Sequence, residues 1–271
     1  MNKIKFIISD IDGCIADFIK PEFPLKQDLS ENLKNLEEIY KSKGDFPEIL
    51  FGVATARSFY QSDHIMEATG FQGPSIFEMG NVIFDPTKGV FNLFEKLEKF
   101  KKDLSVIYEF LNWRKEMFES KKLDKILPEI GLKPMTDRVT MLTYEFHSGF
   151  EDEVYKAINS LMPETIKNAI ENGILKFLRP KGAIDILPNI TKGEALDFIL
   201  KEKSIKRDQV FAIGDSYHSD KDLLNSAGVV GCPQNADLEL QAYIKERGGF
   251  ISNKKTTEGL IDLISKLKNM V

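Results

Sequence analysis

The chain has 271 residues, a formal net charge of −5 at pH 7, 42% hydrophobic residues and 29% charged residues. Its length allows one large domain or two smaller ones, its acidic balance argues against a nucleic-acid partner, and its two cysteines are too few for a disulfide framework. Because no apolar stretch reaches membrane-spanning length and the N-terminal apolar run is too short for a signal peptide, we expect a cytoplasmic protein without a membrane partner.

Apolar runs that end in polar residues predict the strands of a parallel sheet. These runs cover residues 4–8, 49–54 and 210–213. A helix is expected after the first run, from about Asp28 to Lys43, and another after the second run, from Ser58 to about Gly70. This alternation of strands and helices is typical of an α/β fold.

The middle of the chain interrupts the alternation. Residues 84–89 predict a turn, and residues 92–118 predict a long amphipathic helix. A strand-rich stretch, a helix and two short strands are expected next, at residues 136–147, 151–161, 174–178 and 183–187. After Thr191 the α/β pattern returns and continues to a final helix at residues 257–270.

These patterns predict two domains, one of which interrupts the other. The core is expected to consist of residues 1–83 and 186–271. Residues 84–185 are expected to form an α+β domain inserted between the two halves of the core.

Asp10 and Asp12 follow the first apolar run and precede Gly13. The two-residue repeat of a strand would send both carboxylates to the same side. Two carboxylates about 4 Å apart repel by roughly 4 kcal/mol at an effective dielectric constant near 20, so the pair requires a cation or a shared proton, and Mg²⁺ is the simplest answer. Asp10 could attack phosphorus, and Asp12 could exchange a proton with the leaving oxygen and with water. The alternative interpretation is a solvated turn with Asp caps.

Two further polar segments could bind a phosphate group. Thr55 and Ala56 follow the second strand and could supply a hydroxyl and backbone N–H donors, although this segment is also compatible with a plain strand end before a Ser58 helix cap. Thr191 begins a capping-box pattern that carries Lys192 in the first helical turn, where a cation opposes the helix dipole. An ammonium directed at phosphate oxygens would explain Lys192, whereas a solvated lysine is the commoner fate of this residue type.

A fourth polar segment follows the strand predicted at residues 210–213. Asp215 and Asp220 could complete an oxygen-ligand shell for magnesium. The alternative is an acidic loop that caps the next helix.

In their order along the chain, these four segments resemble the motifs of the haloacid dehalogenase (HAD) superfamily, whose members are mostly magnesium-dependent phosphatases. Glu78-Met79-Gly80-Asn81 and Asp185-Ile186-Leu187-Pro188 are further local similarities. The long insertion is similar to the cap of the branch that contains Cof-type and sucrose-phosphate phosphatases. The resemblance implies a Rossmann-like, doubly wound parallel sheet core with an inserted α+β cap domain, and Mg²⁺ as the cofactor.

The resemblance also implies roles for individual residues. By it, Asp10 is the nucleophile that forms an aspartyl-phosphate, and Asp12 is the general acid/base whose backbone carbonyl also binds the metal. Thr55 and Lys192 would bind phosphate. The metal-side acids would be Asp10, Asp12, Asp215 and Asp220. Because Asp220 lies five residues after Asp215 rather than four, the roles of Ser219, Asp220 and Asp222 at the metal stay open.

We therefore expect a magnesium-dependent phosphomonoesterase that hydrolyses a small phosphorylated metabolite, foremost a sugar phosphate, through an aspartyl-phosphate. A phosphomutase of the same superfamily is one alternative, because it needs the same two aspartates. A metabolite-binding homologue without catalysis is another. The sequence leaves the oligomeric state open.

The inserted domain is expected to choose the leaving group, because the four polar segments contact only phosphate. The candidate residues there are Arg138, Glu145, His147, Arg179 and Lys181. For each of them, surface charge or strand pairing is the commoner role of such a residue. Apolar residues fall on both faces of the strand expected at residues 138–147, so the sequence does not identify the substrate.

Overall fold

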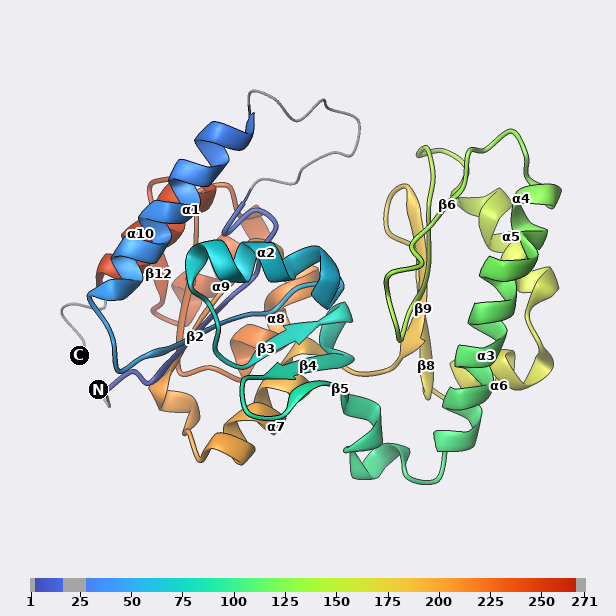
Figure 1. Cartoon of the computed structure of the whole chain (residues 1–271), viewed down its shortest axis with the longest axis horizontal. Helices are drawn as coiled ribbons and strands as arrows, with labels where there is room; N and C mark the ends of the chain where they lie inside the picture. The colour runs from blue at the N-terminus through green and yellow to red at the C-terminus, as the bar shows by residue number, and fades with distance from the viewer. Residues whose placement is uncertain (1–2, 17–27, 267–271) are drawn as a thin grey trace. The chain divides into compact units, whose positions relative to one another are not determined.

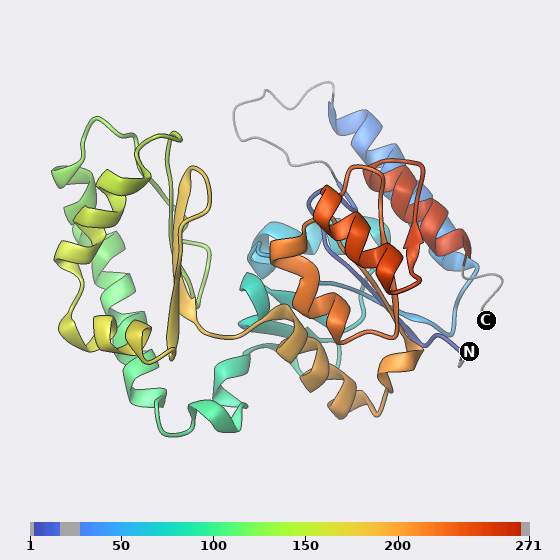
Figure 2. The same ribbon diagram turned by 180° about the vertical axis from the view of Figure 1, so that it is seen from behind.

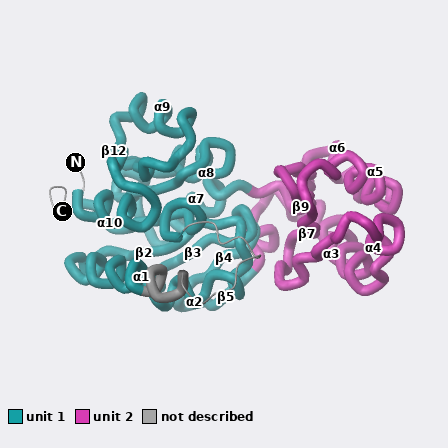
Figure 3. Tube along the Cα trace, turned by 90° about the horizontal axis from the view of Figure 1, so that it is seen from above, with its two compact units in different colours: residues 1–91, 191–271 teal, residues 92–190 magenta. Residues whose placement is uncertain are grey.

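In the computed structural model, the described backbone covers residues 3–16 and 28–266, and the described side chains cover residues 3–16 and 34–266. The chain divides into two compact units (Figure 3). Unit 1 consists of Met1–Phe91 and Thr191–Val271, and unit 2 of Asn92–Ile190. Both junctions lie later in the chain than the predicted boundaries at residues 83 and 185. The assignment of a catalytic core and a cap to these segments stays a prediction.

Unit 1 is built on a five-stranded sheet in which every strand pairs in parallel with its neighbours (Figure 1). Its strand order is β12-β11-β10-β1-β2. The strands are β1 (Phe6–Ser9), β2 (Leu50–Val53), β10 (Val210–Ile213), β11 (Val229–Cys232) and β12 (Phe250–Ile251). All residues of β1 and β10 are buried, which explains why Phe6–Ile8 and Val210–Ile213 are continuous apolar runs rather than alternating ones.

Helices cover both faces of this sheet, as the doubly wound prediction requires (Figure 2). On one face, buried side chains of α1 (Asp28–Gly44), α2 (Phe59–Thr69) and α10 (Thr256–Lys266) share one hydrophobic cluster with Ile7 and Phe51 of the strands. The helices α7 (Lys192–Lys203), α8 (Tyr217–Asn225) and α9 (Leu238–Glu246) lie on the other face. A short 3₁₀ turn, Arg207–Gln209, precedes β10.

The helix boundaries that the sequence predicted are set by their caps. Ser58 and Gln61 form a capping box at the start of α2, and Gly70 ends that helix in the left-handed region. Thr191 and Glu194 form the same box at the start of α7. The side chains of the cap predicted at residues 28–31, and the predicted end of the last helix near Met270, lie outside the described residues.

A second, three-stranded sheet of unit 1 has the order β3-β4-β5. Its strands are β3 (Ser75–Phe77), β4 (Val82–Asp85) and β5 (Gly89–Asn92), with a 3₁₀ turn at Glu78–Gly80. The turn predicted at residues 84–89 is confirmed, since β4 ends and β5 begins within it. Lys203, in the last turn of α7, fixes this hairpin because its Nζ lies 2.7 Å from Oδ2 of Asp85.

Unit 2 is an antiparallel sheet with helices packed on one face (Figure 1). The strand order is β6-β7-β9-β8. The strands are β6 (Lys133–Pro134), β7 (Leu142–Glu145), β8 (Leu175–Leu178) and β9 (Ala183–Pro188). The helices are α3 (Leu104–Ser120), α4 (Lys122–Ile126), α5 (Glu151–Leu161) and α6 (Glu164–Glu171). One hydrophobic cluster joins these helices to β7, β8 and β9, so the α+β character predicted for the insertion is confirmed.

Two predicted elements of the middle segment are wrong in part. The helix expected over residues 92–118 begins only at Leu104, after two 3₁₀ turns at Leu93–Glu95 and Glu98–Phe100. The apolar spacing that suggested a helix there reflects burial of Leu93, Phe94 and Phe100 in those turns. Of the strand-rich stretch at residues 136–147, only Leu142–Glu145 is a strand.

Within the described residues, no helix combines the length and the apolar character needed to span a membrane.

Candidate active site

The polar segments of unit 1 meet where the sheet reverses its strand order. The strands β1 and β10 are neighbours, and the chain continues from β1 to β2 on one side and from β10 to β11 on the other. Asp10 follows β1 directly, and its N–H donates to the carbonyl oxygen of Ile213, the last residue of β10, over 2.9 Å. In parallel α/β sheets, ligands bind at such a switch point beyond the carboxyl ends of the strands.

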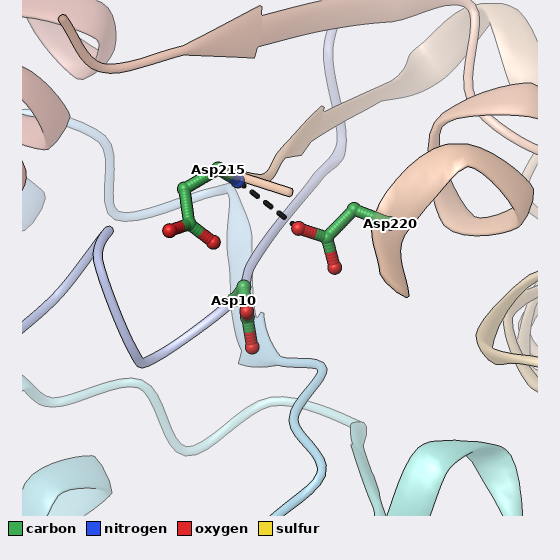
Figure 4. Close-up of side chains that lie close together, drawn as sticks. All are labelled: Asp10, Asp215 and Asp220. Carbon is green, nitrogen blue, oxygen red and sulfur yellow. Dashed lines mark hydrogen bonds between the residues drawn. The ribbon is translucent and has the colours of Figure 1, made fainter. Parts of the chain in front are cut away.

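Three carboxylates converge at this point (Figure 4). Asp10, Asp215 and Asp220 each offer one oxygen, and these oxygens all lie within 4.8 Å of one another. Asp10 is 6% exposed and Asp220 is fully buried. Oδ2 of Asp220 accepts the N–H groups of Asp215 (3.0 Å) and Ser216 (3.1 Å), so the loop after β10 fixes this carboxylate.

Of the three residues that the sequence left open, Asp220 belongs to the carboxylate cluster. Asp222 is exposed and Ser219 is half-buried on α8. The oxygen-only donor set of the cluster suits a hard cation such as Mg²⁺.

Lys192 supplies the positive charge of the site. Its Nζ donates to Oδ1 of Asp220 over 2.7 Å and lies 3.3 Å from Oδ1 of Asp10. The lysine is buried in the first turn of α7, where the carboxylates compensate for its unfavourable position against the helix dipole. The next residue must be glycine, because a Cβ at Gly193 would lie 2.4 Å from the carbonyl oxygen of Asp222 on α8.

The carboxylates outnumber the ammonium, and the pKa values of Asp10 and Asp215 are raised. Burial raises the pKa of Asp10 well above its usual value, Lys192 counteracts this, and Asp220 and Asp215 add to the rise. Burial and the charge of Asp220 raise the pKa of Asp215 to about 7. Burial alone would lower the pKa of Lys192, but Asp10 and Asp220 raise it. This excess of negative charge makes the cluster a candidate site for a further cation.

Asp12 lies in the turn after β1, not in the strand, because β1 ends at Ser9. Its carboxylate is turned to a partner that the sequence reasoning did not identify. The guanidinium of Arg57 donates from Nε to Oδ2 over 2.9 Å and from Nη2 to Oδ1 over 2.5 Å. Nothing in the local sequence indicated a contact across 45 residues.

Thr55 and Ala56 connect β2 to α2 beside this pair. Thr55 is fully buried, and its Oγ1 accepts the N–H of Arg57 over 3.1 Å. The hydroxyl proton of Thr55 donates to no acceptor among the described residues, which leaves it available to an anion. Ala56 is half-buried.

Gly13 allows the loop after β1 and the loop after β10 to approach each other. A Cβ at this position would lie 2.0 Å from Oδ2 of Asp215, and the φ angle of Gly13 is +75°. Asn235, which the sequence analysis did not identify, holds the same loop by donating from Nδ2 to the carbonyl oxygen of Gly13 over 2.8 Å.

The candidate residues of unit 2 have different surroundings. Arg138 is 9% exposed, its Nη1 donates to Oγ1 of Thr143 over 3.1 Å, and it lies 3.6 Å from Oδ1 of Asp185. Its Nε is buried and has no hydrogen-bond partner among the described residues. Glu145 is half-buried on β7 and lies 3.8 Å from Nζ of Lys133.

The other three candidates of unit 2 are exposed: His147, Arg179 and Lys181. Arg179 is engaged on the surface, since it pairs with Asp152 and its guanidinium lies 4.6 Å from the centre of the Tyr155 ring. These contacts agree with a surface role for Arg179 and do not single out His147 or Lys181.

Comparison with protein families gives one match that spans nearly the whole chain. Residues 7–264 match the model of a family described as haloacid dehalogenase-like hydrolase. That range contains the carboxylate cluster, Lys192 and the Asp12–Arg57 pair. Among curated protein sequences, none matches this chain.

Solved structures share the fold at low sequence identity. A Thermoplasma acidophilum protein is 17% identical, with a TM-score of 0.63 and coverage of 98% of this chain and 99% of that one. The sucrose-phosphatase from Synechocystis sp., solved with sucrose and phosphate, is 17% identical, with a TM-score of 0.59 and coverage of 98% and 99%. A Bacteroides thetaiotaomicron protein described among phosphatases of the haloalkanoate (HAD) superfamily is 16% identical, with a TM-score of 0.56 and coverage of 98% and 96%. The predicted α/β core with an α+β insertion is thus confirmed.

Proposed function

This chain belongs to the haloacid dehalogenase-like hydrolase family, and from that premise we propose that it is a magnesium-dependent phosphomonoesterase. In this proposal it hydrolyses a small phosphorylated metabolite of the sugar-phosphate class through an aspartyl-phosphate on Asp10. The main support is one arrangement: Asp10 is buried at the switch point of the sheet, within 4.8 Å of two other carboxylates and 3.3 Å from an ammonium.

The first step transfers the phosphoryl group to Asp10. A carboxylate oxygen of Asp10 attacks phosphorus, and the bond between phosphorus and the ester oxygen breaks with its electron pair on that oxygen. Asp12 gives its proton to the leaving oxygen, so the alcohol departs neutral. Lys192 and the Thr55 hydroxyl provide positive charge and a hydrogen-bond donor for the phosphoryl oxygens, where charge develops in the transition state.

The second step releases phosphate and restores both aspartates. The ionised Asp12 takes a proton from water, whose oxygen attacks phosphorus. The bond between phosphorus and Asp10 then breaks, which returns the electron pair to the carboxylate. Asp12 ends the cycle with the proton that it needs to repeat the first step.

Mg²⁺ fits the donor set of Asp10, Asp215 and Asp220, and when bound it supplies Lewis-acid neutralisation of the charge on the phosphoryl oxygens. The chain itself orients these ligands. Asp220 is fixed by two backbone N–H groups and by Lys192, and Asp215 is kept close to the catalytic loop by the absence of a side chain at Gly13. The proposal that the backbone carbonyl of Asp12 joins this set rests on the family resemblance.

The proposed substrate class is argued from one structural similarity and from one residue of unit 2. The structural similarity to a sucrose-phosphatase solved with sucrose and phosphate favours a sugar phosphate. In unit 2, the buried Arg138 with its unpartnered Nε is the candidate best suited to hydrogen-bond a hydroxylated leaving group. Glu145, His147, Arg179 and Lys181 stay predictions without such support.

A phosphate-release screen tests the function. The purified chain would be incubated with sugar phosphates, phosphoglycolate, nucleotides and 4-nitrophenyl phosphate, with Mg²⁺ or with a chelator. We expect release of inorganic phosphate that depends on Mg²⁺ and is fastest with a sugar phosphate. Transfer between sugar positions without free phosphate would favour a phosphomutase. Ligand binding without any phosphate release would favour a homologue without catalysis.

A further inference from the structure

Arg57 and Asp12 form a two-bond ion pair at the edge of the site. Both guanidinium donors, Nε and Nη2, engage separate oxygens of one carboxylate, at 2.9 and 2.5 Å. The side chains are 19% and 25% exposed, so the pair is only partly reached by solvent. A forked contact of this kind fixes the plane of the carboxylate as well as its position, which a lysine or a single hydrogen bond does not do.

The backbone of Arg57 is anchored on both sides. Its N–H donates to Oγ1 of Thr55 over 3.1 Å, and its carbonyl oxygen accepts the N–H of Glu78 over 3.0 Å. The next residue, Ser58, caps α2. The guanidinium therefore extends from a segment that β2, the turn after β3 and the start of α2 hold in place.

In the part of the chain that the structure describes, the carboxylate of Asp12 has no other such restraint. Its backbone lies in a tight turn in which the N–H groups of Cys14, Ile15 and Ala16 all donate to the carbonyl oxygen of Ile11. Among the described residues, no group other than Arg57 donates a hydrogen bond to its carboxylate oxygens. The turn fixes the position of the Asp12 Cβ, and the hydrogen bonds from Arg57 fix the rotation of the side chain about it.

We propose that Arg57 is the positioning residue for Asp12, fixing the direction from which this carboxyl exchanges its proton with the leaving oxygen. The proposal rests on the proposed function, in which Asp12 is the general acid/base. Misplacing a catalytic group by about 1 Å can reduce the rate about 100-fold, so the loss of the fork has a measurable cost.

Two other roles for Arg57 make different predictions. If Arg57 binds the phosphate group of the substrate, its loss weakens the reaction of every ester equally, because all esters share that group. If the pair is only a surface ion pair, its loss changes stability slightly and leaves catalysis unchanged. A positioning role makes the loss depend on the leaving group, because protonation matters most for the more basic leaving oxygen.

The test compares phenyl phosphate with 4-nitrophenyl phosphate, which have similar shape but leaving oxygens of different basicity. For Arg57→Met we expect kcat/KM to fall about 10-fold more for phenyl phosphate than for 4-nitrophenyl phosphate. Arg57→Lys, which keeps the charge but loses the fork, should show part of the same selective loss. Thermal unfolding of both variants checks that they fold.

Asp12→Asn, measured in parallel, separates failure of the inference from failure of the function. The inference predicts the same selective loss in Asp12→Asn, and no further selective loss when Arg57→Met is added to it. An equal loss for both esters in Arg57→Met, or no loss, overturns the inference if Asp12→Asn still shows the selective effect. If Asp12→Asn shows no selective effect either, the general-acid role of Asp12 in the proposed function is wrong, and the inference falls with it.

Discussion

Lys192 donates a hydrogen bond to Asp220 over 2.7 Å, and both side chains are buried. The same ammonium lies 3.3 Å from Asp10, so one cation joins the proposed nucleophile to an acid of the candidate metal site. Because breaking a buried ion pair leaves an uncompensated charge, this contact should matter both for stability and for activity.

Lys192→Met should therefore lower the free energy of unfolding by about 3 kcal/mol and reduce the rate of phosphate release at least about 100-fold. Thermal unfolding and a phosphate assay with 4-nitrophenyl phosphate measure the two effects. Lys203→Met is the matched control, since it removes a lysine from the opposite end of the same helix. A Lys192→Met protein with wild-type turnover would show that this ammonium does not act on the phosphoryl group.

The pair of Lys203 and Asp85 should contribute to stability alone. Burial alone would raise the pKa of Asp85. Hydrogen bonds from Lys203 and Thr87 outweigh this effect and lower the pKa to about 2. Since the unfolded value is near 4, the stabilisation is complete above that pH and is lost as the pH falls toward 2. Asp85→Asn should cost about 1 kcal/mol at neutral pH and leave kcat unchanged. A stability difference between the variant and the wild type that stayed constant down to pH 2 would contradict this assignment.

Mg²⁺ should stabilise the protein more at pH 8 than at pH 5. Burial and Asp220 raise the pKa of Asp215 to about 7 in the folded chain, against about 4 when unfolded. Between these values the folded state binds more protons, so this group makes the metal-free protein less stable as the pH rises. Above pH 7 the carboxyl group of Asp215 is ionised and can bind the cation. Binding of Mg²⁺ to the folded protein then raises its melting temperature.

Melting curves with and without Mg²⁺ at both pH values measure this effect. Asp215→Asn should reduce the Mg²⁺-dependent shift at pH 8. Equal shifts at pH 5 and pH 8 in the wild type would mean that the carboxylate cluster is not where the ion binds.

Gly13→Ala should reduce activity about 100-fold because its added Cβ collides with Asp215, and not because of backbone strain. Its φ angle of +75° makes an alanine costly, and the added Cβ would lie 2.0 Å from Oδ2 of Asp215. Gly89 has a φ angle of +77° with nothing within 4 Å of the added Cβ, so Gly89→Ala carries the strain without the collision. Each variant should lose about 1 kcal/mol of stability, while only Gly13→Ala should lose phosphate release, by about 100-fold. Equal activity in the two variants would contradict the role given to the Gly13–Asp215 contact.

The sequence predicted the parts of the site that local chemistry makes unusual. Lys192 and Gly193 are poor choices for the first turn of a helix, and in the structure the carboxylates of Asp10 and Asp220 and the close approach of α8 explain them. Asp10 and Asp215 follow buried strands, and parallel pairing of β1 with β10 brings them together. Residues that are far apart in the sequence therefore form one carboxylate cluster because their strands are neighbours in the sheet.

The sequence could not reveal features that depend on partners far along the chain. In the sequence, nothing distinguishes Arg57 from other polar residues that precede a helix cap. Its contact with Asp12 exists only in the folded chain. Apolar spacing reports burial rather than helix type, so the 3₁₀ turns at Leu93–Glu95 and Glu98–Phe100 were predicted as α-helix. Arg138 was expected within a strand, but it precedes β7 and contacts Thr143 and Asp185 instead.

The identity of the phosphorylated residue tests the central claim most directly. The protein would be mixed with 4-nitrophenyl phosphate and Mg²⁺, quenched in acid during turnover, digested and analysed by mass spectrometry. The account predicts a phosphoryl adduct on the peptide that carries Asp10, and neither adduct nor turnover in Asp10→Asn. Wild-type turnover by Asp10→Asn, or an adduct on another residue, would contradict it.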